Sequence, residues 1–245
     1  MRVLKLIFGL ILLSSTPTQA EVARIAVAAN FRAAAQALAA QFETETHHTL
    51  TLSAGSTGQL YAQIRNGAPF DVFLSADQLR PERLIAHDDA IADSQFTYAI
   101  GRLYLGVRHP VSTSQMPLEL TGIHRLSIAN PATAPYGAAA EQVLGQLAFP
   151  EGAPLIAQAQ SISGVNAALA AGAVDAGFVA YASVAQQETP SMPGWLVPDH
   201  LHDPIRQDAV LLKRGADNPA AIAFLAWLRV PAAQHVIRQS GYHVD

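Results

Sequence analysis

Short apolar runs alternate with stretches of helical periodicity along the first third of the chain. The apolar runs have the length and composition of strands, and each is followed by apolar positions spaced three and four residues apart. The predicted strands are residues 22–28, 50–52 and 69–75, and the predicted helices are residues 31–43, 59–66 and 78–86. Strands that alternate with helices in this order favour a parallel sheet with helices on both faces.

Two longer β-type runs, residues 96–107 and 205–213, interrupt this alternation. Between and after them the pattern predicts strands at 125–129, 155–159 and 176–180, and helices at 136–147, 164–171, 181–186, 219–228 and 232–240. We expect the two long runs to cross between two lobes as hinge strands. The predicted fold is α/β, with parallel-sheet lobes made of residues 21–100 plus 210–245 and of residues 101–209.

The first twenty residues have the pattern of a secretory signal peptide. Arg2 and Lys5 precede the short apolar run 6–13, and Thr18 and Ala20 are small residues of the kind that precede a cleavage site. We expect cleavage after Ala20 and a periplasmic or secreted protein. The later stretches are not apolar enough to cross a bilayer, so we do not expect a membrane-embedded chain.

The charge balance and the cysteine content of the chain limit which partners it could bind. The chain has 15 Lys and Arg against 19 Asp and Glu, and removal of the leader would take away two of the cations. An acidic chain without a basic stripe argues against nucleic-acid binding. The chain has no cysteine, which excludes disulfides and thiolate metal sites.

Four turns rich in small residues stand where a predicted strand leads into a predicted helix. These turns are residues 28–31, 55–58, 130–137 and 163–166. The first amides of a helix have no intrahelical partner, and the helix dipole is positive at that end. Such turns are typical of anion sites, and we hypothesise that all four face one cleft and hold one small oxyanion.

Each candidate residue in these turns also has a purely structural interpretation. Asn30 either caps its helix or contacts the ligand, and Ser56 and Thr57 either donate hydroxyl hydrogens or form an ordinary turn and cap. Tyr136 begins a helix, and its hydroxyl either reaches the anion or belongs to a core tyrosine. Val165 would act through its backbone amide, although its side chain alone would be read as core.

The four turns contain no Lys, Arg or His. Neutral dipoles would therefore hold a dianion, and every group in such a site would be a donor. A site made only of donors rejects an anion that carries a proton, because the acidic hydrogen would find no acceptor. We expect hydrogenphosphate to be rejected and a fully deprotonated tetrahedral anion to be accepted.

Signatures of enzymes are missing from the sequence. The glycines around Ser56 lack the lysine of a phosphate-binding loop, and neither G-x-S-x-G nor H-E-x-x-H occurs. His200, His202 and Asp203 are residue types that can ligate a metal ion. They lie in a polar loop, so we interpret them as part of a solvated segment. We expect no catalysis and no cofactor. An exported α/β hydrolase and a sensory or adhesion module remain alternatives.

Six segments together resemble the periplasmic molybdate-binding proteins of ABC transporters. They are VAANF (27–31), AGSTGQLYAQI (54–64), GAPFDVFLSAD (67–77), ANPATAPYGAAA (129–140), GVNAAL (164–169) and AGFVA (176–180). The resemblance covers essentially the whole mature chain. It implies a monomeric, two-lobed type II periplasmic binding protein that closes on molybdate or tungstate. It also implies delivery of the anion to a membrane permease with a cytoplasmic ATPase; a sulfate binder would use similar donors.

Residue by residue, the resemblance implies contacts to the oxygen atoms of the anion and not to the metal itself. The implied contacts are Asn30, Ser56, Thr57, Tyr136 and the amide of Val165. Many relatives carry a serine where Asn30 stands, so an amide donor would replace a hydroxyl here. Some relatives place a binding tyrosine after the AGFVA-like strand, where this chain has Tyr181. We favour Tyr136 because it begins a helix within its turn.

Overall fold

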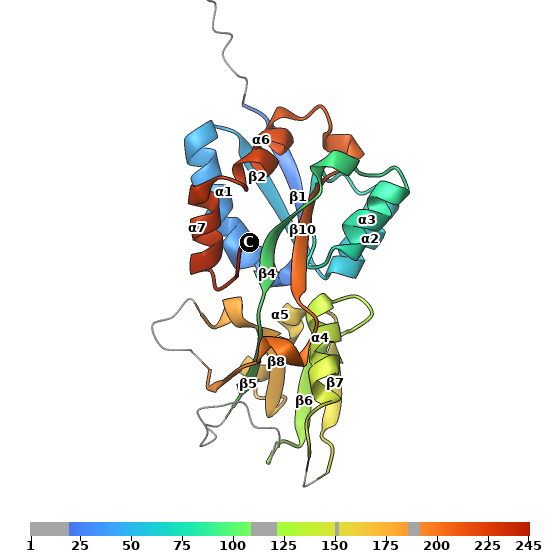
Figure 1. The fold of residues 1–245 in the computed structure, drawn as a ribbon, viewed down its shortest axis with the longest axis vertical. Coiled ribbons are helices and arrows are strands. Elements are labelled where there is room, and N and C mark those ends of the chain that lie inside the picture. The colour runs from blue at the N-terminus through green and yellow to red at the C-terminus, as the bar shows by residue number, and fades with distance from the viewer. Residues whose placement is uncertain (1–19, 109–121, 150–151, 186–191) are drawn as a thin grey trace, which may run out of the picture.

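The structure is a computed structural model that describes residues 20–108, 122–149, 152–185 and 192–245. The predicted signal peptide lies outside the described residues except for Ala20. The described chain forms two lobes, each built on a five-stranded sheet (Figure 1). The predicted two-lobed α/β fold is confirmed.

The sheet of the first lobe has the order β2-β1-β3-β10-β4. Its strands are β1 (Val22–Ala28), β2 (Thr49–Gly55), β3 (Val72–Leu74), β4 (Phe96–Gly101) and β10 (Ile205–Leu211). β1 pairs in parallel with β2 and β3, whereas β10 lies antiparallel between β3 and β4. The expected parallel sheet is mixed in this lobe, because β10 returns from the second lobe and enters the sheet in the opposite direction.

Helices cover both faces of this sheet. On one face lie α1 (Arg32–Thr46), α6 (Pro219–Trp227) and α7 (Pro231–Gln239), and on the other α2 (Thr57–Arg65) and α3 (Leu79–Ala86). Side chains that alternate along a strand point to opposite faces. Accordingly, Ile25 and Val27 belong to the core beneath α1, α6 and α7, while Ala26 belongs to the core beneath α2 and α3. The near-continuous apolar character of these strands follows from burial on both faces.

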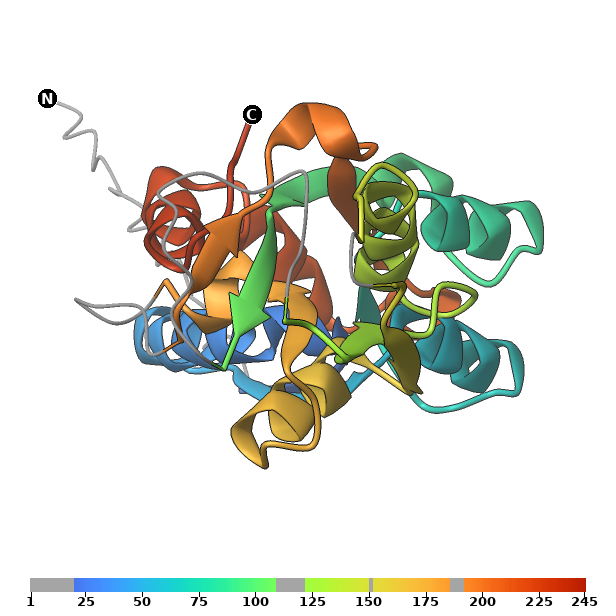
Figure 2. The same ribbon diagram turned by 90° about the horizontal axis from the view of Figure 1, so that it is seen from below.

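The second lobe repeats the plan with the order β7-β6-β8-β5-β9. Its strands are β5 (Leu103–Val107), β6 (Arg125–Ala129), β7 (Leu155–Ala159), β8 (Ala176–Ala180) and β9 (Gly194–Leu196). β6 pairs in parallel with β7 and β8, and β5 is antiparallel to β8 and β9. The helices α4 (Pro135–Leu144) and α5 (Ile162–Ala170) lie on opposite sides of the sheet (Figure 2).

Some short elements differ from the predictions. The helix expected at 181–186 is a single 3₁₀ turn, and β9 was not predicted. The 3₁₀ turns are η1 (Ala29–Phe31), η2 (Ala92–Ser94), η3 (Tyr181–Ser183), η4 (Asp199–Leu201) and η5 (Lys213–Gly215). Segments of three residues are too short to show a periodicity, which explains why pattern alone did not find them.

The chain passes from lobe to lobe at Arg102, between β4 and β5, and again before β10 (Figure 1). The predicted boundary between residues 209 and 210 falls inside β10, whose pairings are with β3 and β4 of the first sheet. The C-terminal segment closes beside the same crossing, because Ile100 and His243 exchange backbone hydrogen bonds of 2.8 and 3.0 Å.

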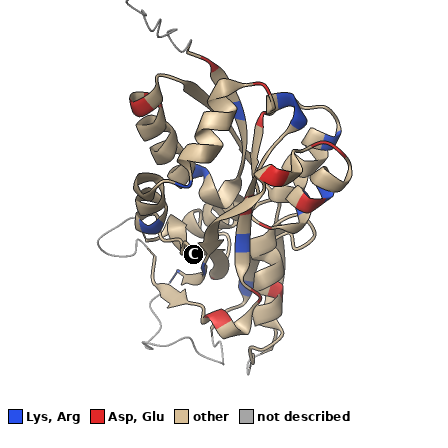
Figure 3. Cartoon of the chain, turned by 45° about the horizontal axis from the view of Figure 1, so that its top comes forward, with Lys and Arg blue, Asp and Glu red and all other residues tan. Residues whose placement is uncertain are grey.

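Charged residues of both signs are interspersed over the two lobes (Figure 3). Within the described ranges, no single helix has the length and apolar character to cross a membrane. Only α6 and α7 taken together, bent by 69° at the break between them, have that length and composition.

Candidate functional site

A small pocket lies where the two lobes meet. The first lobe lines it with Ala29, Asn30, Ser56, Thr57 and Ala76, and the second with Ala134, Pro135, Tyr136 and Ile162. Residues from three of the four predicted turns therefore line this pocket. The fourth turn, residues 163–166, supplies none of the lining residues, but Ile162 just before it does. The lining residues include no charged side chain and no histidine.

The α2 helix presents two buried hydroxyl groups to the pocket. Ser56 is the N-cap residue: its Oγ accepts the backbone N–H of Gln59 at 3.4 Å, and the Gln59 side chain accepts the N–H of Ser56 in return. The Oγ1 of Thr57 accepts the N–H of Ala76 at 3.1 Å. Because each hydroxyl oxygen accepts from a backbone amide, each hydroxyl hydrogen is left to donate.

Asn30 does not cap a helix. It lies within η1, and neither η1 nor α1 has a side-chain cap. Instead its Nδ2 donates to Oε1 of Gln207 at 2.7 Å and to the hydroxyl of Tyr242 at 3.3 Å. The Tyr242 hydroxyl donates in turn to the Asn30 carbonyl at 2.7 Å. Asn30 thus joins the pocket to a polar network that includes β10 and the C-terminal segment.

Tyr136 reaches the pocket from the second lobe. It is the second residue of α4, after Pro135, and only 2 % of its surface is exposed. Its hydroxyl is buried and has no hydrogen-bond partner within the described part of the chain. Burial raises the pKa of Tyr136 well above its usual range, so the phenol is a neutral donor at physiological pH.

The Tyr136 hydroxyl fits against the first lobe because residue 101 is glycine. A Cβ atom at Gly101 would lie 2.1 Å from that hydroxyl oxygen and 3.1 Å from Nε2 of Gln207. The amides of Asn30 and Gln207 oppose the rise in the phenol's pKa, but neither reaches good hydrogen-bond geometry with it. The Tyr136 side chain of the second lobe therefore lies among polar groups of the first lobe.

Val165 is not among the residues that line the pocket. Val165 is fully buried, and its amide donates to the Ser161 carbonyl at 3.4 Å as part of α5. The helix begins earlier than predicted, with Ser161 as N-cap, so Ile162 is its first residue and lines the pocket. Placing the helix start at Ser161 would have assigned the free amides to residues 162 and 163.

Tyr181, the alternative phenol, does not line the pocket either. Its ring lies below the Arg102 guanidinium, with Cζ 4.7 Å from the ring centroid, and 6.1 Å from the ring of Tyr104. Of the two tyrosines considered from the sequence, the structure brings Tyr136 to the pocket.

Hydrogen bonds join the lobes around the pocket. The N–H of Gly58 donates to the Thr133 carbonyl at 2.8 Å, and Nη2 of Arg80 donates to the Ala132 carbonyl at 2.7 Å. Both acceptors belong to the turn that leads into α4. The structure thus describes a closed arrangement of the two lobes.

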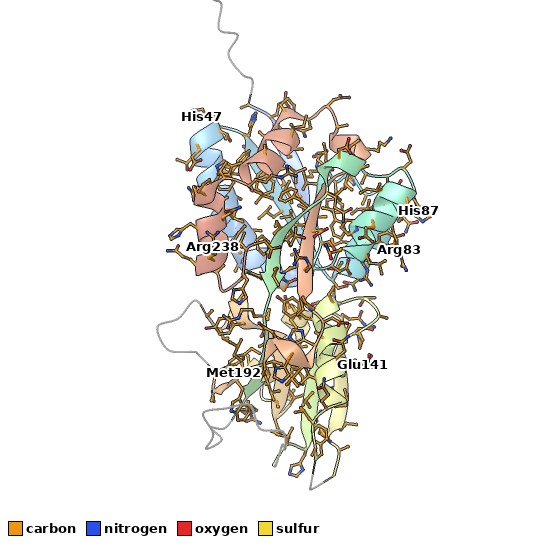
Figure 4. The ribbon with its side chains drawn as sticks, in the orientation of Figure 1. His47, Arg83, His87, Glu141, Met192 and Arg238 are labelled. Carbon is orange, nitrogen blue, oxygen red and sulfur yellow. The ribbon has the colours of Figure 1, made fainter. Side chains whose placement is uncertain are left out.

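Tyr136 is the titratable residue among those that line the pocket. His47 and His87 lie at the outer edge of the first lobe (Figure 4). His48 is buried and stacks on Phe42 with ring centroids 6.2 Å apart. Among the described residues, no cluster of three or more His, Cys, Asp or Glu could hold a metal ion.

Two α/β lobes joined by crossing strands and closed over a small neutral pocket define a solute-binding protein. Comparison with known proteins agrees. The family model of bacterial extracellular solute-binding proteins matches residues 23–243. The chain is 45% identical over 228 residues to the molybdate-binding protein ModA of Azotobacter vinelandii, covering 91% of this chain and 90% of the relative.

A second relative, the molybdate-binding protein ModA of Rhodobacter capsulatus, is 43% identical over 241 residues, covering 98% of this chain and 93% of the relative. The solved structure of the Azotobacter vinelandii periplasmic molybdate-binding protein superimposes with a TM-score of 0.81 at 36% identity, covering 91% of this chain and 99% of that one. The chain belongs to the ModA-like periplasmic binding proteins of the bacterial solute-binding family.

Proposed function

We propose that this protein captures molybdate, and also tungstate, for import by an ABC transporter. Two relatives above 40% identity are named molybdate-binding proteins, and both align over at least nine tenths of this chain. The pocket supports the same ligand class, because its polar groups are hydroxyls and helix-start amides without a formal charge. Such donors suit a small dianion that carries no proton.

One observation carries this proposal. The Tyr136 hydroxyl is buried at the junction of the lobes without a partner in the described chain. A buried donor that lacks an acceptor costs about 1–3 kcal/mol. An oxyanion in the pocket supplies that acceptor and the acceptors for Ser56 and Thr57. Ligand binding then compensates for closing the lobes.

In detail, Ser56, Thr57 and Tyr136 donate hydroxyl hydrogens to the oxygen atoms of the anion. The turn that contains Asn30 and the first turn of α5 at Ile162 contribute backbone amides. The amide of Val165, which the resemblance implies as a contact, stays a prediction, and here it donates to the Ser161 carbonyl at 3.4 Å. No lining side chain could serve as a general base for Ser56, so the pocket favours binding without catalysis.

We infer the cellular setting from the same comparisons and from the leader. The mature chain begins after Ala20, acts in the periplasm as a monomer, and hands its anion to a membrane permease with a cytoplasmic ATPase. No cofactor is involved.

Titration calorimetry on the mature chain tests the ligand. We expect one molybdate or tungstate ion per chain, weaker binding of sulfate, and no detectable binding of phosphate. Sulfate is the second candidate, because a sulfate site also uses neutral donors. Sulfate binding equal to or tighter than molybdate binding would reject the assignment, and heat from phosphate would reject the site made only of donors.

A further inference from the structure

The buried glutamine in the crossing strand β10 has a role that the sequence did not indicate. We propose that Gln207 is a positioning residue: it orients the Tyr136 hydroxyl so that its hydrogen points at the bound anion. Gln207 does not line the pocket itself. The proposal rests on the proposed function, because it concerns the same oxyanion site.

The direction of the Gln207 amide follows from its neighbours. The Tyr242 hydroxyl gives its hydrogen to the Asn30 carbonyl, so its oxygen can only accept. Asn30 therefore turns its NH₂ group toward Tyr242 and toward Gln207. Gln207 therefore faces Asn30 with its carbonyl oxygen. This oxygen accepts from Asn30 at 2.7 Å and from the Tyr98 hydroxyl at 3.4 Å. The chain of donors thus fixes which end of the amide faces Asn30.

The other end of the amide faces Tyr136. Nε2 of Gln207 is buried without an acceptor among the described residues, as is the Tyr136 hydroxyl. Both atoms lie beside Gly101, within 3.1 Å and 2.1 Å of the point where a Cβ would stand. When the phenol oxygen accepts from Nε2, its single hydrogen must point elsewhere. The Tyr242 oxygen already accepts from Asn30, so we assign the phenol hydrogen to the pocket, toward Ser56 and Thr57.

This arrangement makes ligand capture and lobe closure depend on each other. Gln207, Asn30 and Tyr242 belong to the first lobe, and Tyr136 belongs to the second. In the closed state without an anion, the phenol hydrogen has no acceptor within the described residues. With an anion present, one run of hydrogen bonds extends from Tyr242 through Asn30, Gln207 and Tyr136 to the ligand.

A double-mutant cycle in molybdate titration tests the inference. We expect Gln207→Leu to weaken binding by about tenfold, as the loss of one buried hydrogen bond would. In a Tyr136→Phe background the same change should cost less than about twofold, because the group that it orients is gone. Equal losses in the two backgrounds would overturn the inference. Wild-type affinity in the single Gln207→Leu variant would also overturn it.

A failure of the proposed function would give a different result. In that case the unmodified chain would not bind molybdate, and no comparison among variants would arise. If the unmodified chain binds, the proposed function stands, and the cycle then decides on Gln207 alone.

Gln95→Leu is the matched structural control. Nε2 of Gln95 donates to Oδ2 of Asp208 at 2.7 Å, beside Gln207 on β10 but outside the pocket. This change should lower the melting temperature of the ligand-free chain and leave molybdate affinity unchanged. Should Gln95→Leu weaken binding as much as Gln207→Leu, the effect would be general destabilisation, and the inference would be wrong.

Gln207→Glu provides a second readout, the pH dependence of molybdate affinity. The new carboxyl keeps an acceptor for Asn30 but removes the donor to Tyr136 and adds a negative charge near the anion. We expect binding that weakens as the pH rises from 5 to 8, whereas the unmodified chain should show no such trend. A variant with pH-independent, wild-type affinity would show that this end of the side chain does not act on the phenol.

Discussion

A Cβ atom on Gly101 would lie 2.1 Å from the hydroxyl oxygen of Tyr136. Gly101 ends the last strand of the first lobe before the crossing, and Tyr136 belongs to α4 of the second. The missing side chain of one residue is therefore the space that the other occupies when the lobes close. The closed state depends on a glycine at this position for reasons of space.

Gly101→Ala should separate folding from closure. The added methyl group must displace the phenol, and overpacking of this kind costs about 1–3 kcal/mol, or roughly fivefold to 150-fold in affinity. Molybdate titration should show that loss, while the ligand-free melting temperature changes little. Gly145→Ala is a control, because its added Cβ would meet nothing closer than 3.5 Å. Unchanged affinity in Gly101→Ala would mean that Tyr136 does not need this space.

Gly58→Ala should affect binding and stability in opposite directions. Gly58 lies in α2, where alanine is favoured over glycine by up to about 1 kcal/mol. Its Cβ would lie 2.9 Å from Cα and Cβ of Thr133 in the other lobe, where the Gly58 N–H now donates. We expect a higher melting temperature without ligand and weaker molybdate binding. Parallel rises in both quantities would contradict the closed arrangement described above.

Arg80→Met should shorten the lifetime of the bound state. Arg80 pairs with Asp77 within the first lobe and donates to the Ala132 carbonyl of the second at 2.7 Å. That bond forms only on closure, so its loss should raise the dissociation rate about three- to tenfold and leave the association rate nearly unchanged. Stopped-flow release of molybdate measures both rates. Arg65→Met is the control, since Arg65 pairs with Asp89 within the first lobe.

Molybdate affinity should be constant from pH 6 to 9. Tyr136 lines the pocket, and the phenols of Tyr98 and Tyr242 belong to the network behind it; burial raises the pKa of each above its usual range. They remain protonated donors or acceptors across this interval. Titrations at several pH values check the point. A loss of binding near pH 6–7 would implicate a histidine and contradict the neutral pocket.

The same phenols should make stability fall in strong base. Above their ordinary pKa, near pH 10, unfolded tyrosines release protons that the folded chain retains. The unfolded state then binds fewer protons, so the free energy of unfolding decreases as the pH rises. Urea unfolding at pH 8 and pH 11 should show this decrease, and Tyr136→Phe should make it smaller. An equal decrease in that variant would argue against a raised pKa for this phenol.

Most helices and strands could be predicted from the sequence because their buried faces produce a periodic pattern of apolar residues. Apolar runs such as Val22–Ala28 and the helix starts at Ser56 and Tyr136 have local signals that pattern analysis can use. Strand direction has no such signal, so the antiparallel entry of β10 was missed. The start of α5 was placed two residues too late, at Gly164 in place of Ile162, so Ile162 was not considered as a lining residue.

The hydrogen-bond network of Asn30, Gln207 and Tyr242 could not be predicted from the sequence, for a different reason. Gln207 and Tyr242 lie 177 and 212 positions from Asn30, and only the folded chain brings them together. One sign was present in the sequence. Gln207 and Asp208 are buried polar residues in a strand that is apolar from Ala209 onward, and polar residues in a buried strand need partners. That sign indicates that a network exists but not which residues complete it.

The two lobes differ in how much chain must be made before each sheet is complete. All five strands of the second sheet come from the continuous stretch between Leu103 and Leu196. The first sheet pairs Leu74 with Ala209, and β4 meets its partner only when β10 arrives. Contacts so distant along the chain carry a larger entropy of loop closure and form slowly. The lobe synthesised first is therefore the one that must wait for the end of the polypeptide before it can assemble.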